Sequence, residues 1–240
     1  METFTEKRTE EQARHQQMYE EYELFEQGTW LEKPDEQLME ELRQMTRHTQ
    51  AASLRVLDLG CGIGRNSIPM AKIIGPRGGK VTGVDVLEDA LSKLESYSRQ
   101  YQVEDVITVK KGDIEYIRIP PQSYDVIVAH GCLEHVSSVE RFQQALLQLA
   151  EAVKPGGLIS VVVNTHVREK DAETGEPLEP SLELNMSTSD TMEKMKQQFK
   201  DWRIMELSTS PHEVEEVRED RDIRFQHDLI RLTAYCPVSN

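Results

Sequence analysis

A glycine-rich turn carries the clearest chemistry in this sequence, in the run VLDLGCGIG at positions 56–64. Glycines 60, 62 and 64 permit backbone conformations with positive φ and let a ligand approach where a Cβ would collide. Asp85 lies 21 residues beyond Gly64, at the end of the next β-branched run. A carboxylate there can accept both hydrogen bonds of a ribose diol. This spacing predicts a nucleoside-binding site.

Two further segments place polar side chains at the ends of apolar runs. Asp113 follows the third run, where its carboxylate can accept from an adenine amino group while Ile114 packs on the ring. Tyr124 and Asp125 open the fourth run, whose far end delivers His130. Ligands of open α/β sheets bind at the carboxyl ends of the strands, so we expect all these groups at one edge.

His130, Cys132, Glu134 and His135 form a cluster that can be interpreted as metal ligands or as an acid/base group. All four lie in one short stretch and would alternate in direction if extended, which disfavours a common metal. We therefore predict no metal site and place these residues in the ligand pocket. His130 or His135 as a proton acceptor is a hypothesis that follows from their position.

The elements that must position these groups alternate between short aliphatic runs and helical stretches from Leu54 onward, which is typical of βαβ units and a parallel sheet. The five predicted strands are LRVLDL, KVTGVD, VITVK, YDVIVA and LISVVVN. Two further strands, WRIMELS and DLIRLTAYC, follow near the C-terminus and are joined by the charged segment 212–222, which we predict to be a solvated hairpin tip.

Two segments outside these runs complete the predicted organisation. Residues 1–50 form a helical extension with Met18, Tyr22 and Phe25 at helical spacing and a second helix behind Asp35, and residues 51–240 form the main domain. The polar stretch 165–187 is too long for an ordinary connection and is predicted to be an active-site loop.

Composition limits the class of protein. Of 240 residues, 38% are hydrophobic and 30% charged, the balance of a globular enzyme. No run is long enough to span a bilayer and the N-terminus lacks the features of a signal peptide, so we expect a cytoplasmic protein. A net charge of −15 disfavours a nucleic-acid substrate. Three widely spaced cysteines indicate neither a disulfide framework nor a zinc finger.

Taken in order, these motifs resemble those of the class I methyltransferases that use S-adenosylmethionine (SAM). The resemblance rests on VLDLGCGIG, VTGVD, GDI, YDVIVAHGCLEHV and VKPGGLISVV, and covers roughly residues 54–164. It implies a doubly wound, Rossmann-like α/β fold with a seven-stranded sheet in the order 3-2-1-4-5-7-6. The last strand is antiparallel, and the helical extension precedes the sheet.

The resemblance also implies where SAM and its product S-adenosylhomocysteine would bind. The cofactor-binding residues it implies are Asp58, Gly60, Cys61, Gly62 and Gly64 at the methionine part, Asp85 and Val86 at the ribose, Asp113 and Ile114 at the adenine, and His130 beside the sulfonium. A dinucleotide-binding turn requires a third glycine at position 65, where this sequence has Arg65, so NAD fits poorly.

The sequence predicts a small-molecule acceptor, because AHGCLEHV stands where nucleic-acid amino-methylating enzymes carry an N-P-P-Y type motif. GRNS after the glycines resembles the tellurite-resistance group, and the segment from Gly28 to Leu38 is similar to the entry segment of thiopurine and thiol methyltransferases. Candidate acceptor-binding residues are Tyr22, Trp30, His135 and His166; Tyr22, Phe25 and Trp30 either close over the reacting centre or are core aromatics.

Two other functions remain open. A binding module could keep SAM affinity without transfer, because little of the chemistry depends on side chains. A methyltransferase acting on a protein could dock it on residues 1–50, which hold 13 acidic and 6 basic side chains, although such a face is commonly only solvated. We expect a monomer or a homodimer that binds neither membranes nor nucleic acid.

Overall fold

The computed structural model describes residues 3–48, 53–218 and 221–238. Its helices are α1 (Phe4–Glu21), α2 (Glu36–His48), α3 (Ser67–Ile74), α4 (Glu88–Gln100), α5 (Val139–Ala152), α6 (Thr188–Gln198) and the short 3-10 helices η1 (Gly75–Arg77) and η2 (Leu133–His135). Its strands are β1 (Arg55–Leu59), β2 (Lys80–Asp85), β3 (Ile107–Lys111), β4 (Tyr124–His130), β5 (Val153–Asp171), β6 (Pro177–Leu178), β7 (Arg203–Arg218) and β8 (Arg221–Tyr235).

One mixed sheet has the order β3-β2-β1-β4-β5-β8-β7, and the short strand β6 pairs with β5 beside this path. The strands from β3 to β5 are parallel, whereas β8 runs antiparallel between β5 and β7. Apart from β6, this is the predicted seven-strand order, so the predicted fold is confirmed. The chain order reverses between β1 and β4, and open α/β sheets bind ligands at such a switch point.

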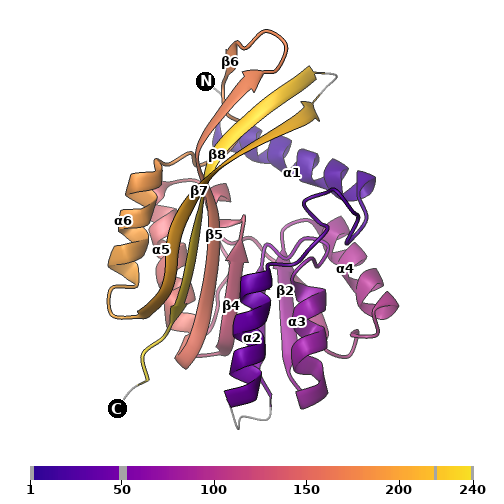
Figure 1. Cartoon of the computed structure of the whole chain (residues 1–240), viewed down its shortest axis with the longest axis vertical. Coiled ribbons are helices and arrows are strands. Elements are labelled where there is room, and N and C mark those ends of the chain that lie inside the picture. The colour runs from indigo at the N-terminus through magenta and orange to yellow at the C-terminus, as the bar shows by residue number, and fades with distance from the viewer. Residues whose placement is uncertain (1–2, 49–52, 219–220, 239–240) are drawn as a thin grey trace.

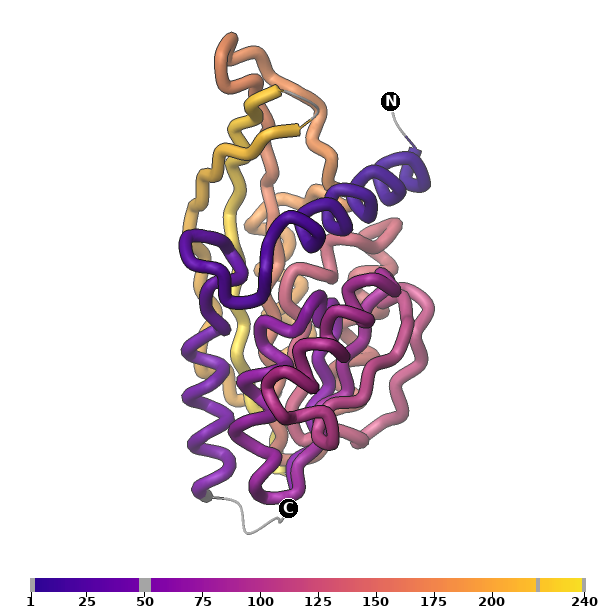
Figure 2. Tube along the Cα trace, turned by 90° about the vertical axis from the view of Figure 1, so that its right-hand side faces the viewer, coloured from indigo at the N-terminus to yellow at the C-terminus, as the bar shows by residue number. Residues whose placement is uncertain are grey.

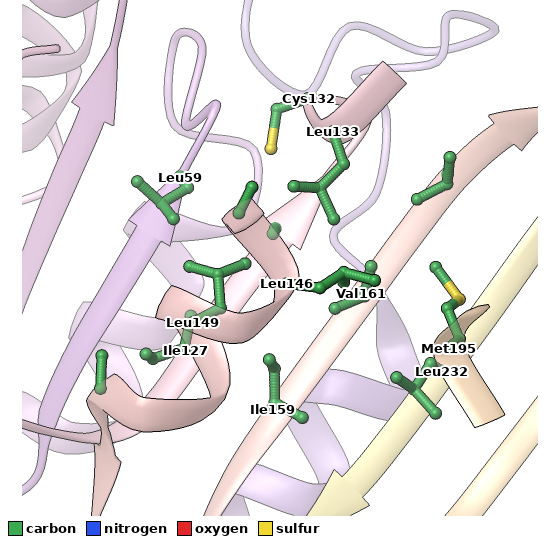
Figure 3. Close-up of a cluster of buried hydrophobic side chains, with 14 of the residues drawn as sticks. Leu59, Ile127, Cys132, Leu133, Leu146, Leu149, Ile159, Val161, Met195 and Leu232 are labelled. Carbon is green, nitrogen blue, oxygen red and sulfur yellow. The ribbon is translucent and has the colours of Figure 1, made fainter. Parts of the chain in front are cut away.

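The central strands bury side chains on both faces. In β4, Ile127 and Ala129 belong to the core that α5 and α6 cover, while Val126 and Val128 belong to the core under α2, α3 and α4. Figure 1 shows the two groups of helices on opposite sides of the sheet, and Figure 3 shows the first core between α5, α6 and strands β4, β5 and β8. Burial on both faces explains why these strands are continuous apolar runs.

Strands β5, β7 and β8 continue beyond the parallel part of the sheet and form a twisted extension (Figure 1). Residues 165–171 of the predicted loop are therefore strand, and so is most of the charged segment predicted to be a hairpin tip, although positions 219–220 lie outside the described residues. The hairpin itself is as predicted. Charged side chains fit its solvated face because they pair across strands, as Arg224 does with Glu215 at 2.8 Å.

Helix α1 crosses beside this extension (Figure 2). A capping box formed by Thr3 and Glu6 starts the helix. The predicted helical face is only partly correct: Met18 lies on α1, but the helix ends at Glu21 and Tyr22 is extended, with φ −110°. Phe25 lies beyond the helix in a left-handed conformation, with φ +67°.

The predicted second helix is present as α2. The Asp35 carboxylate accepts a hydrogen bond from the Leu38 amide at 3.0 Å, which caps the helix as expected. Leu38 and Leu42 are buried under the sheet. The predicted boundary at residues 50 and 51 lies outside the described residues, so the division of the chain at that point stays a prediction.

Candidate functional site

A pocket of about 440 Å³ opens at the carboxyl ends of β1, β2 and β4, between α1 and the sheet extension. The predicted residues that line it are Asp58, Gly60, Cys61, Gly62, Asp85, Val86, Ile114, His130, His135 and Trp30. The sheet thus brings together most of the residues that sequence reasoning selected. Gly64, Asp113, Tyr22 and His166 are not among the lining residues.

The glycine turn at the floor of the pocket needs its glycines. Gly60 and Gly62 have φ values of +66° and +51°, in the left-handed region. An added Cβ would lie 2.6 Å from the Cys132 Cβ at Gly60 and 2.4 Å from the Tyr19 hydroxyl oxygen at Gly62. Gly64 has a different role, because its added Cβ would meet Leu94 at 2.5 Å inside the core. The absence of a side chain at Gly64 allows α4 to pack closely against the turn, and Gly64 does not line the pocket.

Asp85 lies at the end of β2 and links the turn to the next loop. Its carboxylate accepts from the backbone amides of Gly62 at 2.8 Å and Leu87 at 2.9 Å. Burial raises the pKa of Asp85, against the effect of these hydrogen bonds. Further donors would favour the charged form, and two adjacent hydroxyls of a ribose are such donors. The carboxylate and the bare turn therefore fit the sugar and tail of SAM.

Asp58 is buried beneath the same turn. It accepts from the Ser67 hydroxyl at 2.6 Å, and burial raises its pKa to about 7 in spite of that bond. This pairing ties the end of β1 to the first turn of α3. Asp58 therefore shapes the floor of the pocket on which a ligand would lie.

The two residues predicted at the adenine have separated. Ile114 lines the pocket, as expected for a side chain that packs on a ring. The Asp113 carboxylate is paired with Arg8 of α1, 2.7 Å from its guanidinium, and accepts from the Glu115 amide at 2.9 Å. Asp113 is not itself among the lining residues, so its contact with the adenine stays a prediction.

His130 has both ring nitrogens in hydrogen bonds. Asn66 accepts from the Asp35 amide through its Oδ1 at 2.9 Å, so its amide nitrogen must face His130 Nδ1, at 3.4 Å, as a donor. Nε2 then carries the hydrogen and donates to the Ser160 hydroxyl at 2.8 Å. Burial lowers the pKa of His130 to about 3. It is a neutral, fixed ring and a poor proton acceptor.

His135 is in the opposite charge state. Its Nδ1 donates to the Glu183 carboxylate at 2.6 Å. Burial lowers the pKa of His135, but this hydrogen bond and the charges of Glu183, Glu134 and Glu11 outweigh it and raise the pKa to about 9. At neutral pH the ring is a cation, so it can donate a proton but cannot accept one.

Only part of the predicted acceptor-binding group reaches the pocket. Trp30 lines it, with its ring centroid 5.9 Å from that of Tyr19. Tyr22 packs into the core around α4, and His166 lies 53% exposed beside Asp228, with φ +50°. Tyr22 follows the end of α1 and His166 sits at an irregular point of β5, which turns both side chains away from the cavity.

Sequence reasoning missed several lining residues that lie far from the glycine turn along the chain. They are Glu11, His15 and Tyr19 of α1, Glu183, and Phe225 and His227 of β8. The spacing of Glu11, His15 and Tyr19 places them on one face of a helix, and this signal was available. The residues of β8 alternate toward the cavity, but the charges between them obscured that pattern.

No group of three or more His, Cys, Asp or Glu side chains in residues 3–48, 53–218 and 221–238 is arranged to hold a metal ion. Among the helices of the described chain, none combines the length and apolar character needed to cross a bilayer.

Residues 56–157 match the family model of a methyltransferase domain. The ubiquinone biosynthesis O-methyltransferase of Rickettsia canadensis is 30% identical over 132 residues, which cover 55% of this chain and 51% of that protein. The demethylmenaquinone methyltransferase of Lactobacillus johnsonii is 28% identical over 128 residues, covering 53% of this chain and 47% of that protein. The chain thus spans about half the length of the curated relatives it matches.

Solved structures share the fold over more of the chain. TehB from Haemophilus influenzae gives a TM-score of 0.58 at 21% identity, covering 82% of this chain and 62% of that one. A SAM-dependent methyltransferase from Methanosarcina mazei gives 0.54 at 17% identity, covering 82% and 98%. At these identities the similarity establishes the fold alone.

Proposed function

Since this chain belongs to the class I SAM-dependent methyltransferases through residues 56–157 and its strand order, we propose that it transfers a methyl group from SAM to a small-molecule acceptor. The product is S-adenosylhomocysteine. Asp85 carries this proposal: its buried carboxylate faces the pocket beside the bare glycine turn, where ribose hydroxyls would replace the water lost on burial.

The residues of the chain would mainly position the reactants. When bound, SAM supplies a methyl group that its sulfonium charge has already activated. Gly60 and Gly62 would hold the amino-acid tail, Asp85 and Val86 the ribose, and Ile114 the adenine ring. The fixed ring of His130 would bound the site beside the sulfonium. Holding the acceptor in line about 3 Å from the methyl carbon can lower the barrier by several kcal/mol.

The walls of the pocket favour a small molecule over a macromolecule. Helix α1 lies across the cavity and is held to the segment before α6, because Glu11 accepts from the Ser181 hydroxyl at 2.8 Å and Lys7 donates to the Pro180 carbonyl at 2.7 Å. A pocket of about 440 Å³ with α1 lying across it suits a compact acceptor. The relative from Rickettsia canadensis is named an O-methyltransferase, which supports a hydroxyl acceptor.

The direct test is transfer of a radiolabelled methyl group from SAM to panels of thiol, amine, hydroxyl and carboxyl compounds. Label in one small-molecule class supports the proposal. Label only in proteins of a cell extract would indicate the protein-modifying alternative. Tight binding of SAM without transfer to any compound or protein would indicate the binding module instead.

A further inference from the structure

Helix α1 presents a glutamate and a histidine to the pocket one helical turn apart. His15 Nδ1 lies 2.9 Å from the backbone carbonyl oxygen of Glu11 and 3.4 Å from its carboxylate. Both oxygens only accept, so Nδ1 must carry a hydrogen. Nε2 of the neutral ring then holds a lone pair, and the structure gives that atom no hydrogen bond to any described residue. The ring is thus oriented with a basic nitrogen free.

The surroundings of Glu11 keep its carboxylate ionised. Its side chain is 2% exposed and accepts from Arg14 at 2.5 Å and from the Ser181 hydroxyl at 2.8 Å. Burial raises the pKa of Glu11, but the hydrogen bond of His15 and the charges of Arg14 and His15 outweigh it and hold the pKa far below its usual range. A fixed carboxylate beside an imidazole orients the ring and stabilises the imidazolium form.

His15 lies in the cavity close to the rings of His135 and Tyr19. Its ring centroid is 5.6 Å from that of His135 and 6.3 Å from that of Tyr19, which rests against Gly62 of the turn. The charged and titratable groups that face it are Glu11 and Arg14 of its own helix, the His135 and Glu183 pair, Tyr19, and Asp85 at the end of β2. His15 therefore lies between Tyr19, next to the glycine turn, and the His135 and Glu183 pair.

The other histidines of the pocket are poorly suited to accept a proton at neutral pH. Both nitrogens of His130 are bonded, and His135 is already a cation. His227 is 9% exposed, with Nδ1 lacking a partner in the described chain, and burial lowers its pKa to about 4. That leaves His15 as the histidine whose geometry suits a base.

The cations near His15 are already paired. Arg14 also contacts Glu216 at 3.2 Å, and His135 is held by Glu183. Carboxylates thus neutralise Arg14 and His135 in this part of the described pocket. The opposite wall offers Phe225, Leu229 and Leu182, which suit an uncharged molecule.

We propose that His15, oriented by Glu11, is the general base that accepts the proton of an uncharged hydroxyl acceptor. This inference rests on the proposed function. As the acceptor oxygen forms its bond to the methyl carbon, the bond from that carbon to sulfur breaks and its electron pair stays on sulfur. The hydroxyl proton moves to Nε2 of His15. The resulting imidazolium is stabilised by Glu11 and then releases the proton to water.

Nitrogen-15 NMR of the histidine side chains tests the dyad without any acceptor. In full-length protein with S-adenosylhomocysteine, neutral His15 is expected in the Nδ1–H form, the minor form of a free imidazole. In Glu11→Gln the neutral ring is expected to populate the Nε2–H form more, because the carboxylate no longer favours a hydrogen on Nδ1. An Nε2–H form in the wild type, or a tautomer that Glu11→Gln leaves unchanged, would overturn the proposal.

Kinetics with catechol and with 4-nitrothiophenol, which is already ionised at neutral pH, test the catalytic role. His15→Gln is expected to slow transfer to catechol about 100-fold or more, to spare transfer to the thiolate, and to keep affinity for S-adenosylhomocysteine. Gln17→Ala, on the exposed face of the same helix, controls for helix stability. Added imidazole should partly restore His15→Ala.

If His15→Gln methylated catechol at the wild-type rate, the assignment of His15 as the general base would be refuted. Failure of the proposed function would give a different result. A wild-type protein that shows the Nδ1–H form of His15 but methylates neither probe nor any panel compound would refute methyl transfer and leave the pairing of Glu11 and His15 supported.

Discussion

The hydroxyl oxygen of Tyr19 lies 2.4 Å from the position that a Cβ of residue 62 would take, so the glycine turn and helix α1 fit together because residue 62 has no side chain. The two elements are more than 40 positions apart in the sequence. Gly62 therefore serves both the conformation of the turn and the docking of α1.

Gly62→Ala is expected to destabilise the fold by about 1–3 kcal/mol, since a left-handed residue with a Cβ costs roughly 1–2 kcal/mol before any clash with Tyr19. Affinity for S-adenosylhomocysteine should fall at least tenfold, as measured by calorimetry beside a denaturant titration. Gly175→Ala is the matched control, because Gly175 also has positive φ, +74°, but open space around it. Equal effects of the two substitutions would show that the contact with Tyr19 is unimportant.

The ion pair of His135 and Glu183 predicts a pH-dependent stability. The folded pKa of about 9 lies above the usual 6.5, so the folded protein binds the proton more tightly. The stabilisation is complete below pH 6.5 and is lost as the pH rises through 9; at roughly 1.4 kcal/mol per unit it amounts to about 3 kcal/mol at most. Unfolding free energies of His135→Gln should lack this decline. A decline as steep as in the wild type would contradict the assignment.

At the scale of elements, α1 is held to the sheet extension by an ion pair. Arg14 bridges Glu11 of its own helix at 2.5 Å and Glu216 of β7 at 3.2 Å. Arg14 and Glu216 are partly exposed and Glu11 keeps the Ser181 hydroxyl as a donor, so removing Arg14 is expected to cost about 1–2 kcal/mol, less than the loss of a fully buried partner. The helix therefore has a stability of its own that can be changed separately from that of the sheet.

Arg14→Ala is accordingly expected to speed amide hydrogen exchange throughout α1 by about tenfold, the rate equivalent of about 1.4 kcal/mol. Exchange in β1 and β4 should not change. Gln17→Ala should leave α1 as protected as in the wild type. Uniform acceleration across helix and sheet would mean that α1 does not open independently.

The elements show what sequence alone can predict. The apolar strands followed from hydrophobic runs, because a sheet covered on both faces imposes that pattern, whereas their order in the sheet followed from the resemblance to class I methyltransferases. The sheet extension could not be predicted from hydrophobic runs, because the alternating charges of β7 on its solvated side give a sequence like that of a loop. The residues from Gly60 to Asp85 were found because turn and strand end are close in sequence. The ion pair of Asp113 with Arg8 was not predicted, because the two residues lie more than 100 positions apart in the sequence.

At the scale of the whole molecule, the net charge of −15 works against phosphate backbones. Affinity for nucleic acid without sequence preference comes from lysines and arginines that neutralise phosphates. We expect no retardation of duplex DNA or structured RNA in electrophoresis at physiological salt, with or without SAM. Retardation that weakens steeply as salt rises would instead reveal a basic surface patch and reopen a nucleic-acid acceptor.

The central claim is that the glycine turn and Asp85 form a SAM site, and calorimetry of full-length protein with SAM and S-adenosylhomocysteine tests it most directly. We expect one site per chain and a loss of affinity of about 100-fold in Asp85→Ala, since hydrogen bonds to a charged group contribute roughly 1.5–3 kcal/mol each. Asp201→Ala, on the exposed surface, should bind like the wild type. Failure of the folded wild-type protein to bind either compound at millimolar concentration, or undiminished binding by Asp85→Ala, would contradict the account.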